Sequence, residues 1–171
     1  MADDKDRLKI EGKHKFDSAR FQAFLADIKG HLFNQPMELW SFDEVKDALR
    51  LHNQLYRGLQ DIPIDRIVGS VGRYNDFTRE FLPRNPELEE RWSRVYAQVH
   101  SLEGVPPIDV YQVDDVYFVR DGNHRVSIAR QLGFTTIQAH VTEIETPVDL
   151  EPDMTQKMWD NAIAYSAFLA R

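Results

Sequence analysis

The sequence contains no cysteine among its 171 residues. Disulfide bonds and thiol catalysis are therefore excluded, and a zinc site would have to be built from histidine and carboxylate side chains alone. We expect no protein-built metal site.

Long apolar runs are also absent. The first residues, MADDKDRLKIEGKHKF, are charged throughout and lack the apolar segment of a signal peptide. No later run approaches the roughly 20 apolar residues that cross a membrane. We therefore expect a cytoplasmic protein with no membrane partner.

Positive charge is in deficit, with 21 Lys and Arg against 28 Asp and Glu and a formal net charge of -7. Such a molecule repels polyanions, so DNA binding by this chain alone is doubtful without a local basic patch. A small anionic ligand remains compatible with this charge, because a helix N-terminus and a few arginines can hold phosphate.

The first sixty residues contain two predicted helices. Residues 1–15 show little apolar pattern and are predicted to be a flexible lead-in. A helix is expected from Asp17 to between Gly30 and Asn34, and a second begins with the Ser41 and Glu44 capping box and continues to Gly58. The apolar positions that recur at helical spacing in the first helix are Phe21, Phe24, Leu25, Ile28 and Leu32.

Residues 61–146 show a mixed pattern that predicts an α+β core. A strand is expected over 62–68 (IPIDRIV), a helix from Asn85 and Pro86 to Gly104, and a hairpin from the runs IDVYQV and VYFVR. A further helix from Asn123 and a strand ending near Val141 complete this core.

The remaining residues, 147–171, are predicted to be an acidic linker and a helix from Asp153. We expect the three segments, 1–60, 61–146 and 147–171, to form one structural unit. The apolar face of the last helix, with Met154, Met158 and Trp159, is a candidate contact for a homodimer.

The segment DGNHRVSIARQLG, residues 121–133, predicts a phosphate-binding turn that opens a helix. Gly122 lets the backbone approach a ligand closely, and the helix dipole favours negative charge at this end. Asp121 would cap the turn or hold a metal ion that accompanies phosphates, and His124 and Arg125 add donors.

Arg125 is the strongest single candidate in this turn. On a helical wheel it projects from the apolar arc, where an unpaired charge is costly, so it needs a carboxylate or a phosphate. His124 lies near the boundary of that arc and is expected to lean toward solvent. The alternative interpretation is an internal salt bridge for Arg125, with Asp121 as an ordinary turn residue.

A second basic segment, GSVGRYNDFTREFLPR at 69–84, is the only concentrated basic and aromatic stretch. Arg73 is a candidate phosphate ligand, and a neighbouring aromatic ring could stack on a base. The alternative is that Phe77 and Phe81 anchor the core and the arginines are solvated.

From Ile62 to Ile144 the order of these motifs resembles the ParB/sulfiredoxin superfamily. The turn corresponds to G-E-R-R in ParB proteins, which hold CTP, to G-C-H-R in sulfiredoxins, which hold ATP, and to D-G-H-H-R in free-serine kinases. The resemblance implies a small mixed sheet with helices. It also implies that Gly122, Asn123, His124 and Arg125 line a triphosphate and that Arg73 matches the arginine after the first ParB strand.

The chain departs from these relatives at two points. Asn123 replaces the catalytic cysteine of sulfiredoxin, so sulfinic acid repair is excluded. VTEIETPVDLEPD follows the closing strand in place of the ParB E-N-x-x-R segment and helix-turn-helix, which makes a DNA clamp doubtful.

Three functional hypotheses follow. In the first, the domain grips ATP or CTP, with Mg²⁺ bridging the phosphates, and either hydrolyses the nucleotide or senses it as a regulator. In the second it is a small-molecule kinase of the serine type, with Asp65, Asp76 or Glu80 as the catalytic base. In the third it is a non-catalytic regulatory or DNA-associated module.

Overall fold

A computed structural model describes residues 2–33 and 38–171 of the chain. The described residues form two compact units, each assembled from separate stretches of sequence. The helical unit contains Met1–Leu39, Arg73–Pro106 and Gly122–Phe134, and the sheet unit contains Trp40–Gly72, Pro107–Asp121 and Thr135–Arg171.

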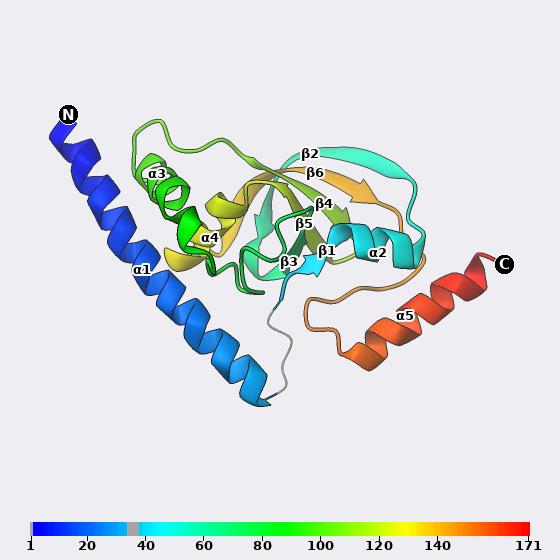
Figure 1. Cartoon of the computed structure of the whole chain (residues 1–171). Helices are drawn as coiled ribbons and strands as arrows, with labels where there is room; N and C mark the ends of the chain where they lie inside the picture. Colours follow the sequence, from blue (N-terminus) through cyan, green and yellow to red (C-terminus); the bar gives the residue numbers. More distant parts are fainter. Residues whose placement is uncertain (1, 34–37) are drawn as a thin grey trace. The chain divides into compact units, whose positions relative to one another are not determined.

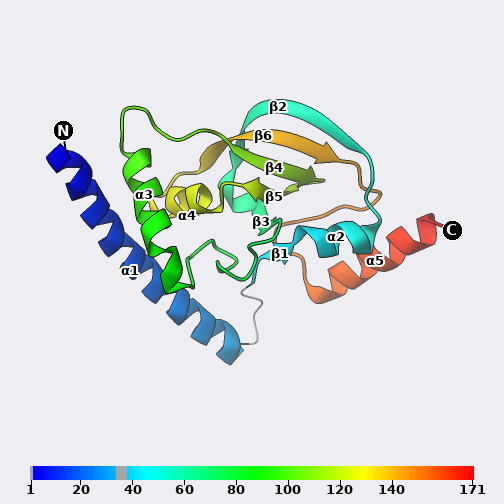
Figure 2. The same cartoon turned by 45° about the horizontal axis from the view of Figure 1, so that its top comes forward.

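The sheet unit contains a six-stranded mixed sheet, which together with the helices confirms the predicted α+β class (Figure 1). Its strands are β1 (Trp40–Ser41), β2 (Gln54–Pro63), β3 (Ile67–Ser70), β4 (Ile108–Val113), β5 (Val116–Asp121) and β6 (Thr136–Ile144). They are ordered β1-β3-β5-β4-β6-β2, with β4 antiparallel to β5 and parallel to β6. The long strand β2 forms one edge of the sheet and pairs antiparallel with β6 (Figure 2).

Two helices pack within the sheet unit, α2 (Phe42–Leu49) and α5 (Gln156–Leu169). Trp159 of α5 lies against Trp40 with ring centroids 5.6 Å apart. Ser166 of α5 donates its hydroxyl to the carbonyl of Leu49 at the end of α2 (2.8 Å). Burial of these side chains removes apolar surface from water and stabilises the unit.

The helical unit contains α1 (Ala2–Phe33), α3 (Glu89–Val99) and α4 (Asn123–Gln131), with a short 3₁₀ helix, η2 (Pro86–Leu88), before α3. α1 and α3 lie side by side (Figure 1). They approach closely because Gly12 of α1 has no side chain: an added Cβ would lie 3.1 Å from the Cα of Ser93. Phe16 of α1 packs edge-on against Trp92, and Tyr96 donates its hydroxyl to Glu11 (2.8 Å).

The N-terminal helix differs from the prediction at its start. Residues predicted to be a flexible lead-in are helical from Ala2 onward. The packing face of this helix consists mostly of small residues, namely Gly12, Phe16, Ala19 and Ala23. Among the mixed charges of the segment, these small residues do not form a recognisable apolar pattern, so the sequence did not predict the helix. The predicted apolar positions from Phe21 to Leu32 do share one side of α1, but that side is exposed. The predicted end of this helix lies partly outside the described residues.

The predicted second helix, from Ser41 to Gly58, is wrong beyond Leu49. The Ser41 hydroxyl caps α2 by accepting from the Glu44 N–H (3.4 Å), as the capping box predicts. α2 then ends because Arg50 adopts a left-handed conformation (φ 54°). The next residues form β2, whose hydrogen bonds to β6 are non-local and invisible to helical periodicity.

The predicted strand over 62–68 is likewise divided. Ile62 and Pro63 end β2, a 3₁₀ helix, η1 (Ile64–Arg66), follows, and β3 begins at Ile67. The predicted hairpin, the Asn85 cap and the helix from Asn123 are confirmed. α3 ends at Val99 rather than near Gly104, and α5 begins at Gln156 rather than Asp153. Among the described residues, no helix combines the length and apolar character needed to span a membrane.

Candidate functional site

The predicted phosphate-binding turn is a sharp strand-to-helix transition. β5 ends at Asp121, Gly122 adopts φ 119° and ψ 25°, and α4 begins at Asn123. A side chain is strained in this left-handed region, so glycine is required for the turn. The first turn of α4 contains no acidic residue, and the partial positive charge of the helix terminus is therefore not neutralised by its own sequence.

His124 is the most unusual residue of the turn. It is only 5% exposed, although we expected it to lean toward solvent. The ring of Phe77 covers it edge-on at 5.4 Å between centroids. Within the described part of the chain, neither ring nitrogen of His124 has a hydrogen-bond partner. Buried polar atoms normally find partners, so both nitrogens carry a desolvation cost that a ligand could relieve.

The electrostatic surroundings keep the His124 ring neutral. Burial is the largest cause and, with the positive charges of Arg91 and Arg73, lowers its pKa to about 4. A neutral imidazole offers one N–H donor and one acceptor. The two guanidinium groups also favour an anion near the ring.

Arg91 was not among the predicted site residues. It lies on the exposed side of α3, directly before Trp92, whose indole N–H donates to Ser127 of α4 (2.9 Å). The sequence did predict the α3 helix containing Trp92. It could not predict that this helix packs against α4, which brings the charge of Arg91 to the turn.

Arg125 does not sit as a buried unpaired charge. Its side chain is half-buried, and Nη1 donates to the carbonyl oxygen of Pro106 (2.8 Å). This bond gives the guanidinium a partner inside the protein. The expectation that Arg125 also pairs with a carboxylate or a phosphate stays a prediction. A guanidinium has five donors and can make several hydrogen bonds at once.

The loop after β3 contributes Arg73 and two of the three candidate bases, Asp76 and Glu80. Arg73 is exposed and pairs with Asp76 (Nη1 to Oδ2, 3.3 Å). Glu80 in the same loop is exposed. Asp65 lies in η1 and Asp121 at the end of β5, and both belong to the sheet unit.

Phe77, Phe81 and Arg84 of this loop have structural contacts. Phe77 and Phe81 are fully buried, which supports the alternative that they anchor the core. Arg84 forms a bidentate pair with Asp27 of α1, with a shortest distance of 2.6 Å. The guanidinium of Arg130, on α4, lies over the ring of Phe81 at 5.9 Å from the ring centroid.

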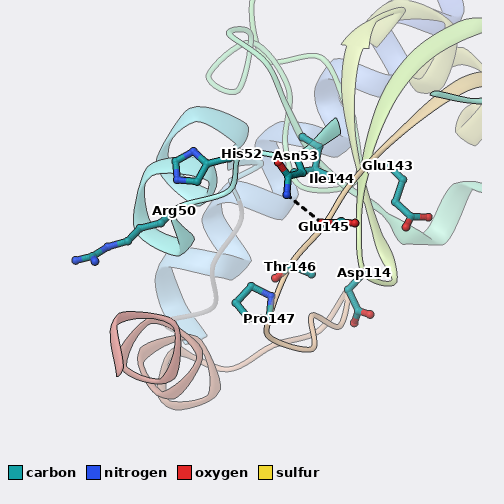
Figure 3. A pocket seen from close by; sticks show the side chains of 9 residues that line it. All are labelled: Arg50, His52, Asn53, Asp114, Glu143, Ile144, Glu145, Thr146 and Pro147. Atoms are coloured by element: carbon teal, nitrogen blue, oxygen red, sulfur yellow. Dashed lines mark hydrogen bonds between the residues drawn. The ribbon is translucent and has the colours of Figure 1, made fainter. Parts of the chain in front are cut away.

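A pocket of about 560 Å³ lies in the sheet unit, away in sequence from the predicted turn (Figure 3). Arg50, His52 and Asn53 line it together with Asp114 and residues 143–147. Asn53 donates its side-chain amide to Glu145 (3.1 Å), as the dashed line in Figure 3 marks. None of the predicted site residues lines this pocket.

A metal site built by the protein is not found in the part of the chain that the structure describes, where no three His, Asp or Glu side chains gather suitably.

Comparisons with known proteins identify relatives for part of the chain. A family model described as the ParB N-terminal domain matches residues 56–158. A crystal structure of sulfiredoxin from Arabidopsis thaliana is 21% identical, with a TM-score of 0.39, and the match covers 51% of this chain and 86% of that one. No curated protein matches the sequence.

Proposed function

The chain belongs to the ParB N-terminal domain family, and we propose that it binds the phosphate groups of a nucleoside triphosphate at the start of α4. The observation that carries this proposal is the buried His124 ring, whose two nitrogens have no partner within the described residues.

A phosphate group fits the chemistry of this position. Its oxygens accept hydrogen bonds, and the neutral His124 ring supplies a donor that has no competing acceptor among the described residues. The N-terminal end of α4 adds a favourable dipole, and Gly122 lets a ligand approach the backbone. Arg73 and Arg125 supply the positive charge that the net charge of the whole chain does not.

The nucleotide would be ATP or CTP, as the family resemblance implies. Mg²⁺ would be held chiefly by phosphate oxygens and water, with Asp121 as the nearest carboxylate in sequence. Asn123, next in the turn, would line the same phosphates.

Calorimetric titration with ATP, CTP, GTP and ADP, with and without Mg²⁺, tests the proposal. We expect one of the triphosphates to bind, and Arg125→Ala to weaken binding about 10-fold or more, since a hydrogen bond to a charged group contributes about 1.5–3 kcal/mol. Arg94→Ala is the matched control, because Arg94 is exposed and pairs with Glu90 at the surface. Absence of binding by every nucleotide would overturn the proposal.

His124→Phe separates binding from folding. Phenylalanine keeps an aromatic ring against Phe77 but removes both unpartnered nitrogens. We expect the variant to be at least as stable as the wild type and to lose nucleotide binding. A variant that binds normally would show that His124 does not contact the ligand.

A small-molecule kinase is the second candidate function. Asp76 favours it, because this carboxylate lies 3.3 Å from Arg73, whose charge acts on His124. Asp76 would accept the proton of a substrate hydroxyl as the hydroxyl oxygen attacks the γ-phosphorus and ADP leaves. Transfer of labelled phosphate from ATP to serine, lost in Asp76→Asn and retained in Glu80→Gln, would establish this activity. Phosphate release without an acceptor would indicate hydrolysis, and binding without turnover would indicate a sensor.

A further inference from the structure

The last third of α1 carries an exposed apolar surface that its own unit leaves uncovered. We define the apolar stripe as the five large side chains on this surface, each between 42% and 72% exposed: Phe21, Phe24, Leu25, Ile28 and Leu32. Single exposed apolar residues are common on soluble proteins, but a contiguous row of five marks an interaction surface.

The stripe lies almost opposite the face that α1 uses to pack on α3. That packing face contains Gly12, Phe16, Ala19 and Ala23. At 3.6 residues per turn, the two faces are separated by roughly 160–170° around the helix. α1 therefore contacts α3 with one side and presents a second apolar side outward, which makes it a two-sided helix.

The stripe begins abruptly. The positions that would extend it toward the N-terminus are His14 and Ser18, both polar and exposed. Beyond these two positions Ile10 is the next exposed apolar residue on this side of α1, so the stripe from Phe21 to Leu32 is separated from it by polar residues. Its length from Phe21 to Leu32 suits about three turns of a partner helix.

We propose that the apolar stripe is the contact between two copies of this chain, which pair through antiparallel α1 helices. Phe21, Leu25, Ile28 and Leu32 are spaced by four, three and four residues, which is the seam of a coiled coil. The spacing of four, three and four residues reads the same from either end of the seam. A two-fold axis that passes between Leu25 and Ile28 therefore places the seam of one copy against the seam of the other. Phe21 then faces Leu32 of the second copy, as the self-complementary interface of a C₂ dimer requires.

The size of the stripe fits a dimer. An aromatic side chain buries about 150–250 Å² when wholly covered. With this range as an upper size for all five side chains, the exposed fractions leave at most roughly 400–700 Å² on each copy. The total of roughly 800–1,400 Å² spans the approximately 1,000 Å² that a specific interface needs.

The charges beside the seam are compatible with this arrangement. The antiparallel register places Lys29 of one copy beside Gln22 of the other on one flank of the seam, and Phe24 beside His31 on the other flank. No like charges meet at these positions, so nothing beside the seam opposes the burial of the stripe. This proposal is independent of the nucleotide site.

Sedimentation equilibrium of the full chain at micromolar concentration tests the proposal. We expect twice the chain mass of 20.0 kDa for the wild type and the monomer mass for Leu25→Glu, with unchanged circular dichroism because Leu25 is exposed and glutamate favours helix. Phe21→Lys provides a second disruption of the same surface. Phe168→Glu, on the exposed side of α5, is the matched control and should remain a dimer.

Three results would overturn the proposal. The first is a monomeric wild type, which includes the case in which another part of the same chain covers the stripe. The second is a dimer that dissociates in Phe168→Glu but not in Leu25→Glu. The third concerns orientation: the chain has no cysteine, so Gln22→Cys mixed with Lys29→Cys should form a mixed disulfide across an antiparallel pair, and failure to do so would exclude this register.

Discussion

The indole N–H of Trp92 donates to the hydroxyl of Ser127 at 2.9 Å, and both side chains are completely buried. The bond joins α3 to α4 one helical turn after His124. It therefore fixes the part of α4 that carries the proposed phosphate site.

Removal of this hydroxyl should destabilise the helical unit. In Ser127→Ala the indole N–H keeps its burial and loses its acceptor, which costs about 1–3 kcal/mol. Urea unfolding followed by tryptophan fluorescence measures the loss. Ser101→Ala, which removes an exposed hydroxyl bonded to Gln98, should change stability by less than about 0.5 kcal/mol. Equal effects of the two substitutions would contradict the prediction.

The buried histidine should make stability depend on pH. The folded pKa of His124 is about 4, below its ordinary value of 6.5, so between these values the unfolded chain binds more protons than the folded one. The free energy of unfolding should therefore fall as the pH is lowered from 6.5 to 4. Below pH 4 the contribution of His124 to this free energy should no longer change.

The pH effect is isolated by comparison with His124→Phe, which removes the titrating group. The wild type should lose no more than about 3 kcal/mol relative to this variant between pH 7 and pH 4. Unfolding free energies at several pH values measure the difference. A difference that does not vary with pH would show that His124 titrates normally.

Arg91 should act on His124 through its charge. Because this charge helps to lower the pKa of His124, Arg91→Gln should raise that pKa toward 6.5. An NMR titration of the ring protons measures the change. Arg94→Gln, on the same helix and paired with Glu90, should leave the titration unaltered. Equal shifts in both variants would instead indicate a general effect of net charge.

Gly69 should not tolerate a side chain. A Cβ at this position would clash with the backbone carbonyl of Trp40 and lie 2.6 Å from the ring of Phe118. Gly69→Ala should therefore cost about 1–3 kcal/mol or more, because β1, β3 and β5 must separate to admit it.

Gly12→Ala is the comparison for this substitution. Its Cβ contacts are looser, at 3.1–3.2 Å, and alanine recovers about 1 kcal/mol of helix propensity. It should therefore cost clearly less than Gly69→Ala in thermal or chemical unfolding. The reverse order would contradict the packing seen at β1.

Local sequence signals predicted the turn at Gly122 and the helix after it, because the glycine and the helical period act within a few residues. They did not predict the end of α2. Gln54 pairs with Ile144, some ninety positions away, and no local pattern records such a partner.

The same limit applies to the site. A helical wheel places His124 on one side of α4, but it does not show that Phe77, from a distant loop, covers that side. Arg91 was not predicted for the same reason, because its effect on His124 depends on how α3 packs on α4. Gly122, the start of a helix and Arg125 predicted a phosphate-binding turn from the sequence, and the family resemblance implied that the phosphate belongs to a nucleotide. The unpartnered nitrogens of His124 add a physical argument that the sequence could not supply.

The passage of the chain between its two units, after residues 39, 72, 106, 121 and 134, has a consequence for attempts to divide the protein. No single cut separates the units, because each consists of three stretches that alternate along the chain with the three stretches of the other. A fragment limited to residues 56–158, the family match, would lose α1, β1 and α2 and would leave the α1-facing side of Trp92 and Tyr96 bare. We therefore expect a fragment of residues 56–158 to be less stable than the full chain, because segments outside the family match cover part of its apolar surface.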